Sequence, residues 1–226
     1  MVIRMKEGIQ NIIDLFINPS ATFRRLKSKP RWMLAFSVYL ILSVLLAWAL
    51  TPFTLSLLAD RSVQSQGHNK AHIVFSSALV SMTYTMLWFL LLCCLLTIAV
   101  RMLKVNKDIK SKHIFAAVMH TIIVRITTFF VNVGLLPLFK NPEDIQTPMD
   151  TRIVPGLHLL TGSLQDQNLL MFLSYINPLE FWYIFVLTIG IYILVEISRI
   201  KAFVTALIVW LLRVSLDVLY IALFLQ

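Results

Sequence analysis

The sequence predicts an all-α membrane protein, a bundle of five transmembrane helices preceded by amphipathic helices at the membrane interface. Five long apolar runs lead to this prediction, at residues 32–59, 73–103, 114–139, 181–198 and 202–225. Each is near or above the ~20 residues that cross a hydrocarbon core of about 30 Å. The composition agrees, because 58% hydrophobic and 14% charged residues lie outside the range of soluble domains. The runs are too long for the strands of a closed β-barrel.

The basic residues predict the orientation of the bundle. Seven Lys and Arg precede the first run, five lie at the end of the second run or between it and the third, and two lie between the fourth and fifth. The opposite gaps hold only Arg61, Lys70, Lys140 and Arg152. By the positive-inside rule we expect a cytoplasmic N-terminus and an external C-terminus, as five spans require. Topology then accounts for the net charge of +9, and we expect no nucleic-acid partner.

Residues 1–31 are predicted to form a separate cytoplasmic region of two helices. Apolar residues recur at helical spacing over residues 5–16 while polar residues occupy the other faces. This pattern is typical of an amphipathic helix that lies on the cytoplasmic leaflet. Asn18 is expected to cap a second, short helix that begins at Pro19. We expect its apolar residues, Phe23 and Leu26, to face the bilayer.

The same region carries a cluster of basic residues just before the first span. Near anionic headgroups each of them gains about 1 kcal/mol. They serve either as a simple topology anchor or as a docking surface for a partner. This polar stretch also differs from a secretory signal peptide, so we expect the first span to be retained. The cluster consists of Arg24, Arg25, Lys27, Lys29 and Arg31.

Residues 32–226 are predicted to form the five-span domain, with one sizeable external loop at about 140–177. Three prolines in this loop, Pro142, Pro148 and Pro155, indicate an ordered, turn-rich segment. Apolar and polar residues then mix between Gly156 and Tyr175, which favours a short helix at the outer interface.

Three ionisable residues lie deep within the predicted spans. Arg125 and Arg213 are each about 12 residues into a run, roughly 18 Å along the helix and near the middle of the bilayer. Asp217 follows Arg213 by one turn, so these two can pair, which leaves Arg125 without a counter-charge. Glu180 and Glu196 lie near the ends of the fourth span and are not expected to reach it. The group is either a structural network or a site for an anion or a partner.

Small polar residues occur in the outer halves of the second and third spans. Thr127, Thr128 and Asn132 are examples in the third span. Such residues usually permit close helix packing and bond across helices. The alternative is a polar lining that opens outward and that His120 and Arg125 extend inward.

Three segments carry a resemblance to a known family. They are residues 16–26 (FINPSATFRRL), residues 176–182 (INPLEFW) ahead of the fourth span, and residues 198–202 (SRIKA) between the fourth and fifth spans. In this order and at this separation, they resemble the bacterial branch of the Yip family, Ypt/Rab-interacting-protein-like five-span membrane proteins. The resemblance implies a multi-pass accessory protein of the bacterial plasma (inner) membrane. In bacteria such proteins are sometimes associated with ABC-type export systems.

The sequence offers little support for an enzyme. It has no Gly-rich phosphate loop, zinc-protease pair or serine-hydrolase elbow, and no third ligand accompanies His68 and His72. We therefore expect no catalytic residue, metal or cofactor. The favoured hypothesis is an accessory or adaptor protein that binds membrane lipids and a membrane-protein partner or a second copy. The alternative is a small transporter or lipid-binding protein with an anion site at the midplane.

Overall fold

All regular elements in the described part of the chain are helices. The computed structural model describes residues 2–59, 70–102, 111–162, 164 and 166–224. The long helices are α1 (Val2–Ile17), α2 (Pro19–Ser28), α3 (Met33–Ala59), α4 (Lys70–Met102), α5 (Ser111–Phe139), α7 (Pro178–Val195) and α8 (Arg199–Phe224). The loop between α5 and α7 contains η2 (Pro142–Asp144), η3 (Pro148–Thr151), η4 (Leu157–Leu160) and α6 (Gln167–Ser174). The predicted all-α class is confirmed for these residues.

Among the described residues, four helices are long and apolar enough to cross a membrane. These stretches are Met33–Phe53, Ser111–Phe139, Pro178–Val195 and Arg199–Tyr220. The protein is therefore a multi-pass membrane protein. In α4 the apolar stretch that can be described is shorter, Met86–Ala99, although the helix has 33 residues. The second of the five predicted spans accordingly stays a prediction.

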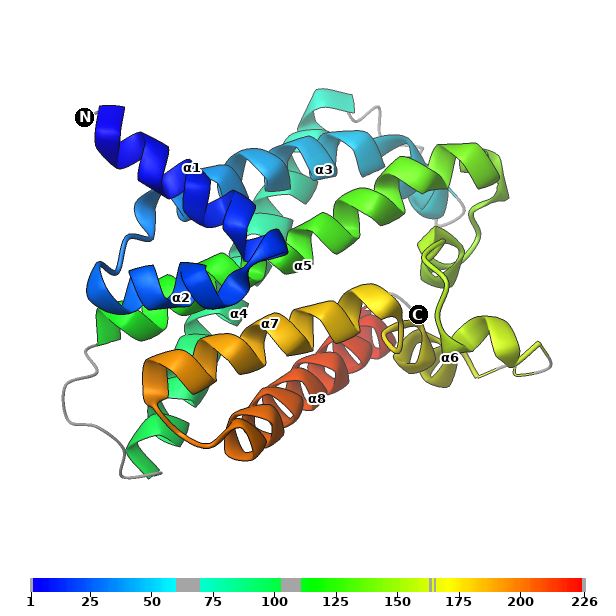
Figure 1. Cartoon of the computed structure of the whole chain (residues 1–226). Coiled ribbons are helices and arrows are strands. Elements are labelled where there is room, and N and C mark those ends of the chain that lie inside the picture. The colour runs from blue at the N-terminus through cyan, green and yellow to red at the C-terminus, as the bar shows by residue number, and fades with distance from the viewer. Residues whose placement is uncertain (1, 60–69, 103–110, 163, 165, 225–226) are drawn as a thin grey trace.

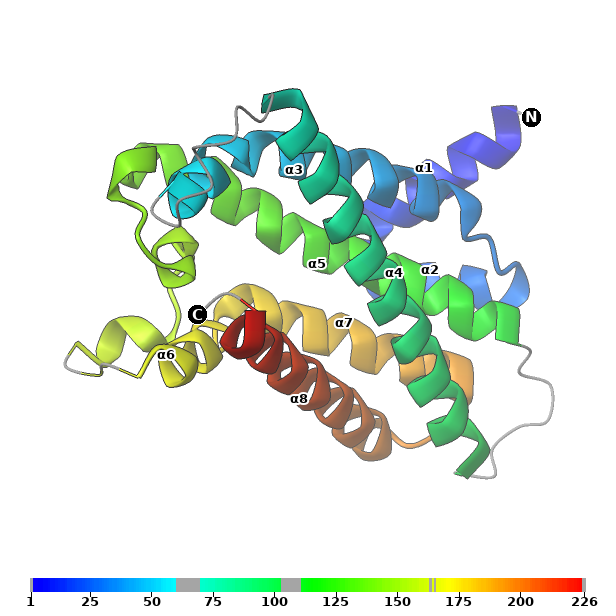
Figure 2. The ribbon, with the colours of Figure 1, turned by 180° about the vertical axis from the view of Figure 1, so that it is seen from behind.

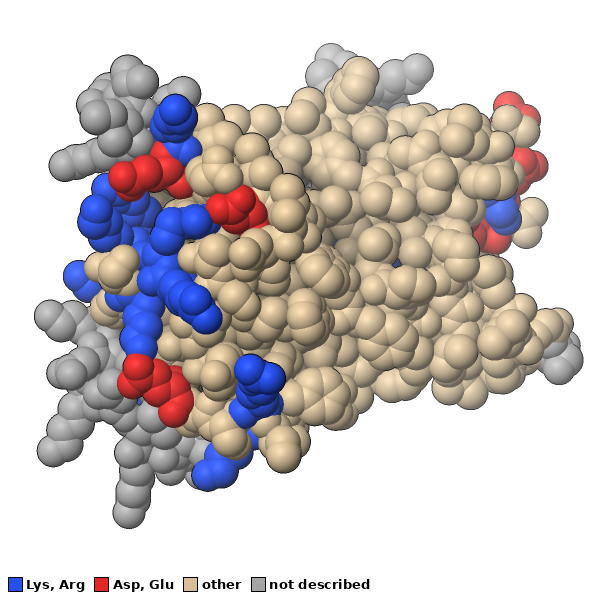
Figure 3. All heavy atoms as spheres, in the orientation of Figure 1, with Lys and Arg blue, Asp and Glu red and all other residues tan. Residues whose placement is uncertain are grey.

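The helices run between two ends of different charge. In Figure 1, α3, α5 and α8 start at the same end, α7 runs back toward it, and α4 crosses behind them, as Figure 2 shows from the other side. Figure 3 shows Lys and Arg gathered at this end, a broad uncharged band, and a smaller charged group at the far end. We call the first end the basic end. The uncharged band is what a hydrocarbon core requires, since it has no water to solvate a charge.

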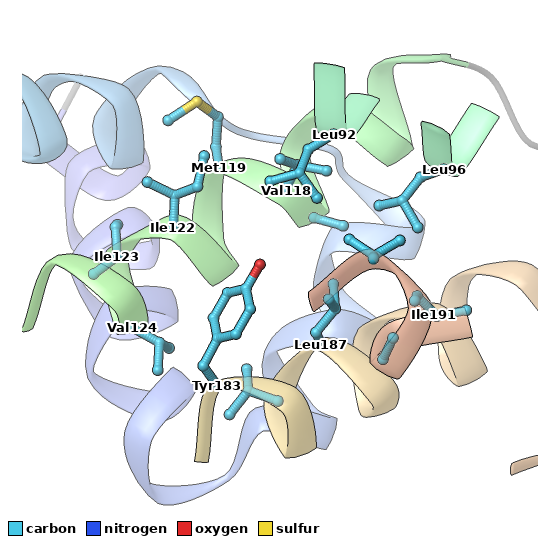
Figure 4. Packing of buried hydrophobic residues seen from close by; sticks show 14 of the residues in the cluster. Leu92, Leu96, Val118, Met119, Ile122, Ile123, Val124, Tyr183, Leu187 and Ile191 are labelled. Carbon is cyan, nitrogen blue, oxygen red and sulfur yellow. The ribbon is translucent and has the colours of Figure 1, made fainter. Parts of the chain in front are cut away.

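The first half of α5 lies at the centre of the bundle. Residues 116–124 are all buried, because α2, α3, α4 and α7 contact α5 around its circumference. A helix that is apolar on all faces is expected at such a position. Figure 4 shows this core, in which α4 contributes Leu92 and Leu96 and α7 contributes Tyr183, Leu187 and Ile191.

The two N-terminal helices pack on the bundle. As predicted, Asn18 caps α2: its Oδ1 accepts a hydrogen bond from the Ala21 N–H at 3.1 Å. The prediction that Phe23 and Leu26 face the bilayer is wrong, because both are fully buried and α2 packs on α7. Gly190 of α7 makes this possible, since a Cβ there would lie 2.9 Å from the Phe23 ring. The absence of a side chain creates the space that Phe23 fills.

The loop between α5 and α7 is fastened to the last third of α5 by Asn132. The Asn132 Oδ1 accepts hydrogen bonds from the Ile153 and Val154 N–H groups at 2.8 and 3.1 Å, and its Nδ2 donates to the Thr151 carbonyl at 2.5 Å. The helix expected from Gly156 onward begins later, at Gln167, because Asp166 caps it there. The described part of the loop thus forms defined turns and helices, and it ends directly at the start of α7.

The contact between Gly190 and Phe23 can be tested by adding one methyl group at position 190. Alanine at position 190 forces α2 away from α7, and overpacking of this kind costs about 1–3 kcal/mol. We expect Gly190→Ala to lower the melting temperature of the detergent-solubilised protein. The matched control is Gly134→Ala in α5, where a Cβ meets nothing within 4 Å. Equal stability of the two variants would contradict the packing of α2 on α7.

Candidate functional site

Four charged residues from three helices, three of them buried and Arg125 partly buried, form a continuous network. Arg125 of α5 donates from Nη2 to Asp217 Oδ2 of α8 at 3.1 Å, and Arg213 of α8 donates from Nη2 to Glu180 Oε1 of α7 at 3.0 Å. The Arg213 Nε lies 3.8 Å from the same oxygen of Asp217. We call these four residues the ion-pair network. Two arginines face two carboxylates, so the network is charge-balanced, and even Arg125, its most exposed member, has a side chain only 11% exposed.

The start of α7 holds the Glu180 carboxylate in place. Asn177 caps the helix by accepting from the Leu179 and Glu180 N–H groups, both at 3.0 Å, and Pro178 is the first helical residue. Glu180 therefore lies in the first turn, where the positive end of the helix dipole stabilises a negative charge. Its Oε2 also accepts from Trp210 Nε1 at 2.9 Å. Both carboxylate oxygens are thus satisfied away from water.

The pairing agrees with the prediction only in part. Asp217 was expected to pair with Arg213, and the Arg213 Nε does lie 3.8 Å from its carboxylate. Arg125 was expected to have no counter-charge, but it donates to Asp217, and Arg213 also donates to Glu180. Glu180 was judged too close to the outer end of its span. Glu180 and Arg213 meet because they lie at similar distances from the basic end. Glu180 lies about 22 Å along α7 from its basic end, and Arg213 lies about 21 Å along α8 from the same end.

Aromatic rings cover the guanidinium groups. The ring of Tyr175 lies between Arg152 and Arg213, with its centroid 4.7 and 5.2 Å from their Cζ atoms. The Tyr175 hydroxyl accepts from Arg152 Nη2 at 2.9 Å, and Phe129 lies 5.4 Å from the Cζ of Arg125. Desolvated cation–π contacts contribute about 2 kcal/mol. They matter here because Nε and Nη1 of Arg213 donate no hydrogen bond within the described residues.

A small polar cavity adjoins the network on the side of the loop between α5 and α7. Thr128, Asn132, Arg152, Tyr175 and Glu180 are among its lining residues. Its volume of about 20 Å³ accommodates about one water molecule. Two of the polar residues of α5 singled out above, Thr128 and Asn132, therefore line a small opening, whereas Thr127 donates to the Ile123 carbonyl of its own helix.

His120 does not join this group in the described contacts. It is 2% exposed, and its Nδ1 lies 2.7 Å from the Ala116 carbonyl of the same helix. The geometry identifies His120 as a packed core residue with a local hydrogen bond. The side chains of His68 and His72 lie outside the described residues, and the described residues contain no group of three possible metal ligands.

The basic residues ahead of α3 divide into paired and unpaired ones. Arg25 binds Asp14 at 2.5 Å and Asn11 at 2.7 Å. Lys27 pairs with Glu196 at the end of α7, and Arg31 pairs with Glu7 of α1. Arg24 and Lys29 are exposed, and no ion pair to a described residue involves them. Three of the five residues thus fasten α2 or the connection after it to α1 or α7, while Arg24 and Lys29 are exposed.

Two titratable groups of the loop between α5 and α7 have shifted pKa values. Burial lowers the pKa of His158, and the positive charge of Arg152 lowers it further, so this imidazole is neutral at pH 7. Burial alone would raise the pKa of Asp150. Hydrogen bonds from Thr147 and Lys140 outweigh that effect and lower the pKa, so Asp150 stays ionised. Neither of these two groups therefore changes its charge near neutral pH.

One comparison with known proteins gives a match. The model of the Yip1 domain family matches residues 13–220, a stretch that includes α2 and the whole ion-pair network. No curated protein and no solved structure matches the chain significantly.

Glu180 offers a direct test of the buried network. Glu180→Gln leaves Arg213 with only the more distant Asp217, and breaking one partner of a buried pair costs about 3–5 kcal/mol. We expect a large drop in melting temperature in detergent. The matched control is Glu196→Gln, which breaks the exposed pair with Lys27, worth about 0–1 kcal/mol. Similar melting temperatures for the two variants would show that Glu180 carries no buried charge interaction.

Charge balance can be tested separately at the other pair. Asp217→Asn leaves Arg125 and Arg213 facing a single carboxylate, so we expect strong destabilisation. Adding Arg125→Gln removes the excess positive charge and should restore much of the melting temperature. If the double variant is less stable than Asp217→Asn alone, charge balance is not what this pair supplies.

Proposed function

Since the chain belongs to the Yip1 domain family, a family of non-enzymatic membrane proteins, we propose that it is an accessory protein of the bacterial plasma membrane that binds and assists another membrane component. In this proposal it spans the membrane five times, with the basic end in the cytoplasm. An ABC-type export system is one candidate partner, and a second copy of the chain is another. No catalytic step is assigned to any residue.

The charge balance of the ion-pair network is the observation that carries this proposal. Both membrane-embedded arginines already pair with carboxylates. These ion pairs balance the charge of the network and join α5, α7 and α8. A protein whose interior charges are used in this way interacts through its outer surfaces. Two surfaces are available, the apolar band around the helices and the basic end.

Each surface suits a different kind of partner. The band exposes large apolar side chains such as Ile41 and Trp48 on α3 and Phe181 and Phe185 on α7, which suit lipid chains or the helices of a membrane protein. The basic end presents Arg24 and Lys29, which suit an acidic cytoplasmic surface or anionic headgroups. The proposal uses both, with lateral packing in the membrane and electrostatic docking in the cytoplasm.

The alternative, a transporter or lipid-binding protein with a midplane anion site, has less support. An incoming phosphate or carboxylate would have to displace Asp217 or Glu180 from its arginine. The cavity beside the network holds about one water molecule, which is smaller than a phosphate group. We therefore place this function second.

The docking role of the basic end can be tested with the native membrane. We expect extraction in a lipid-retaining polymer, followed by mass spectrometry, to recover a stoichiometric membrane protein with the wild type. Arg24→Glu combined with Lys29→Glu should release this partner. The matched control combines Arg199→Glu with Lys201→Glu, exposed residues at the same end of the bundle.

The comparison of the two double variants decides the interpretation. Equal losses would mean that a general attraction to anionic lipids holds the partner, contrary to the docking proposal. A single anionic lipid species that co-purifies in place of a protein, and that Arg125→Ala removes, would favour the anion-site alternative.

A further inference from the structure

The turn between α1 and α2 lies well inside the bundle. Helix α2 packs along α7 and α5, and α2 and α7 run in the same direction, toward the basic end (Figure 1). Phe23 contacts Gly190, which lies about 8 Å along α7 from the basic end of that helix. Pro19 precedes Phe23 by one turn, so the start of α2 lies about 13 Å from that end, roughly halfway along α7.

Charge along the hairpin follows this depth. Residues 15–23 (LFINPSATF), which form the turn and its flanks, contain no charged side chain. Charged residues lie at the open end of the hairpin, Lys6 and Glu7 in α1 and Arg24, Arg25 and Lys27 in α2. The hairpin is thus uncharged at its turn and charged at its base, as a segment that enters a membrane from one side should be.

The one charge near the turn is neutralised within the hairpin. Asp14 accepts from Arg25 at 2.5 Å and from the Gln10 amide at 2.7 Å. Arg25 reaches from α2 across to α1 and also donates to Asn11 at 2.7 Å. Lipid would require such internal pairing, since it cannot solvate a free carboxylate.

Several backbone groups of the turn are hydrogen-bonded within the hairpin. The Asn18 N–H donates to the Asp14 carbonyl at 2.7 Å, and the Ala21 and Thr22 N–H groups donate to the Asn18 carbonyl at 3.1 and 3.4 Å. Pro19 has no N–H to satisfy. Thr22 Oγ1 donates to the Asn11 carbonyl at 3.2 Å, so a side chain of α2 bonds to the backbone of α1. Non-helical backbone at membrane depth is tolerated only when its polar groups find partners in this way.

Helix α1 presents an apolar stripe away from the protein. Ile9, Ile13 and Ile17 are 44%, 48% and 77% exposed and follow one another at one-turn intervals. Their exposure increases toward the turn, where the hairpin is deepest. On the opposite face, Leu15 is completely buried against the bundle. Three outward isoleucines beside an uncharged turn match the acyl chains of a lipid.

We infer that α1 and α2 form a re-entrant hairpin, which enters the leaflet at the basic end, turns at Asn18–Pro19 and returns to the same side. Lipid acyl chains cover the Ile9, Ile13 and Ile17 stripe, and the basic base lies among the headgroups. This revises the expectation that the first helix lies flat on the membrane surface. The assignment of this leaflet to the cytoplasmic side rests on the orientation in the proposed function.

Collision-based depth measurements with spin labels test the inference on the full-length protein. Cys93 and Cys94 are free and are first replaced by alanine. Single cysteines at Ile13 and Ile17 then receive a nitroxide label, and the protein is reconstituted in vesicles of phosphatidylethanolamine and phosphatidylglycerol. Both positions are exposed on the protein surface, so the label disturbs no packing.

Two reference positions calibrate the accessibility of the label to oxygen and to the nickel chelate. Trp48→Cys, exposed on the membrane-spanning helix α3, reports the lipid environment, and Lys29→Cys, exposed at the base of the hairpin, reports water or headgroups. We expect the labels at Ile13 and Ile17 to resemble Trp48, with frequent collisions with oxygen and several-fold fewer collisions with a water-soluble nickel chelate than Lys29.

Two results would overturn the inference. Nickel accessibility at Ile17 equal to that at Lys29 would place the hairpin outside the hydrocarbon. Shielding from both reagents would mean that a second copy of the chain covers the stripe. Because the measurement uses purified protein alone, its outcome is independent of whether the docking partner exists.

Discussion

A charge within the hydrocarbon must meet an opposite charge, and this constraint determines how the bundle is built. Arg125 and Arg213 come from helices far apart in the chain, and their counter-charges, Asp217 and Glu180, require α5, α7 and α8 to meet at one depth. The same constraint also affects the segment that precedes α7. Asn177 ends the loop between α5 and α7 at the depth where Glu180 can reach Arg213, and Tyr175 packs its ring against the same guanidinium. The loop therefore helps to hold the buried ion pairs of the bundle in place.

Local features of the fold were predictable because they depend on residues close in sequence. The apolar runs gave the positions of α3, α5, α7 and α8, and Asn18 before Pro19 gave the start of α2. The sign of the charge on each side of the bundle followed from counting Lys and Arg. Each of these inferences needs only a helix rise, a capping rule or the cost of a charge in lipid.

Features that depend on the relative depth of distant residues were not predictable in the same way. The structure buries Arg213 and Asp217 and partly buries Arg125. Glu180 is buried too, but it was set aside because its position in its own span was judged without the length of α8. Phe23 was assigned to lipid because nothing local reveals that Gly190, 167 residues later, leaves room for it. The position of Glu180 after an Asn-Pro cap was the available signal, since a first-turn glutamate is held in a defined direction.

The ion-pair network also has a consequence for the biogenesis of the protein. Along the chain, Arg125 enters the membrane first, Glu180 second, and Arg213 and Asp217 last. Until α8 arrives, Arg125 lacks Asp217 and Glu180 lacks Arg213, so the partly inserted chain carries uncompensated charges. Insertion of α8 supplies both missing partners at once. Insertion of α7 and α8 as one helical hairpin, across the short connection at residues 196–198, avoids exposing Glu180 and Arg213 separately to lipid.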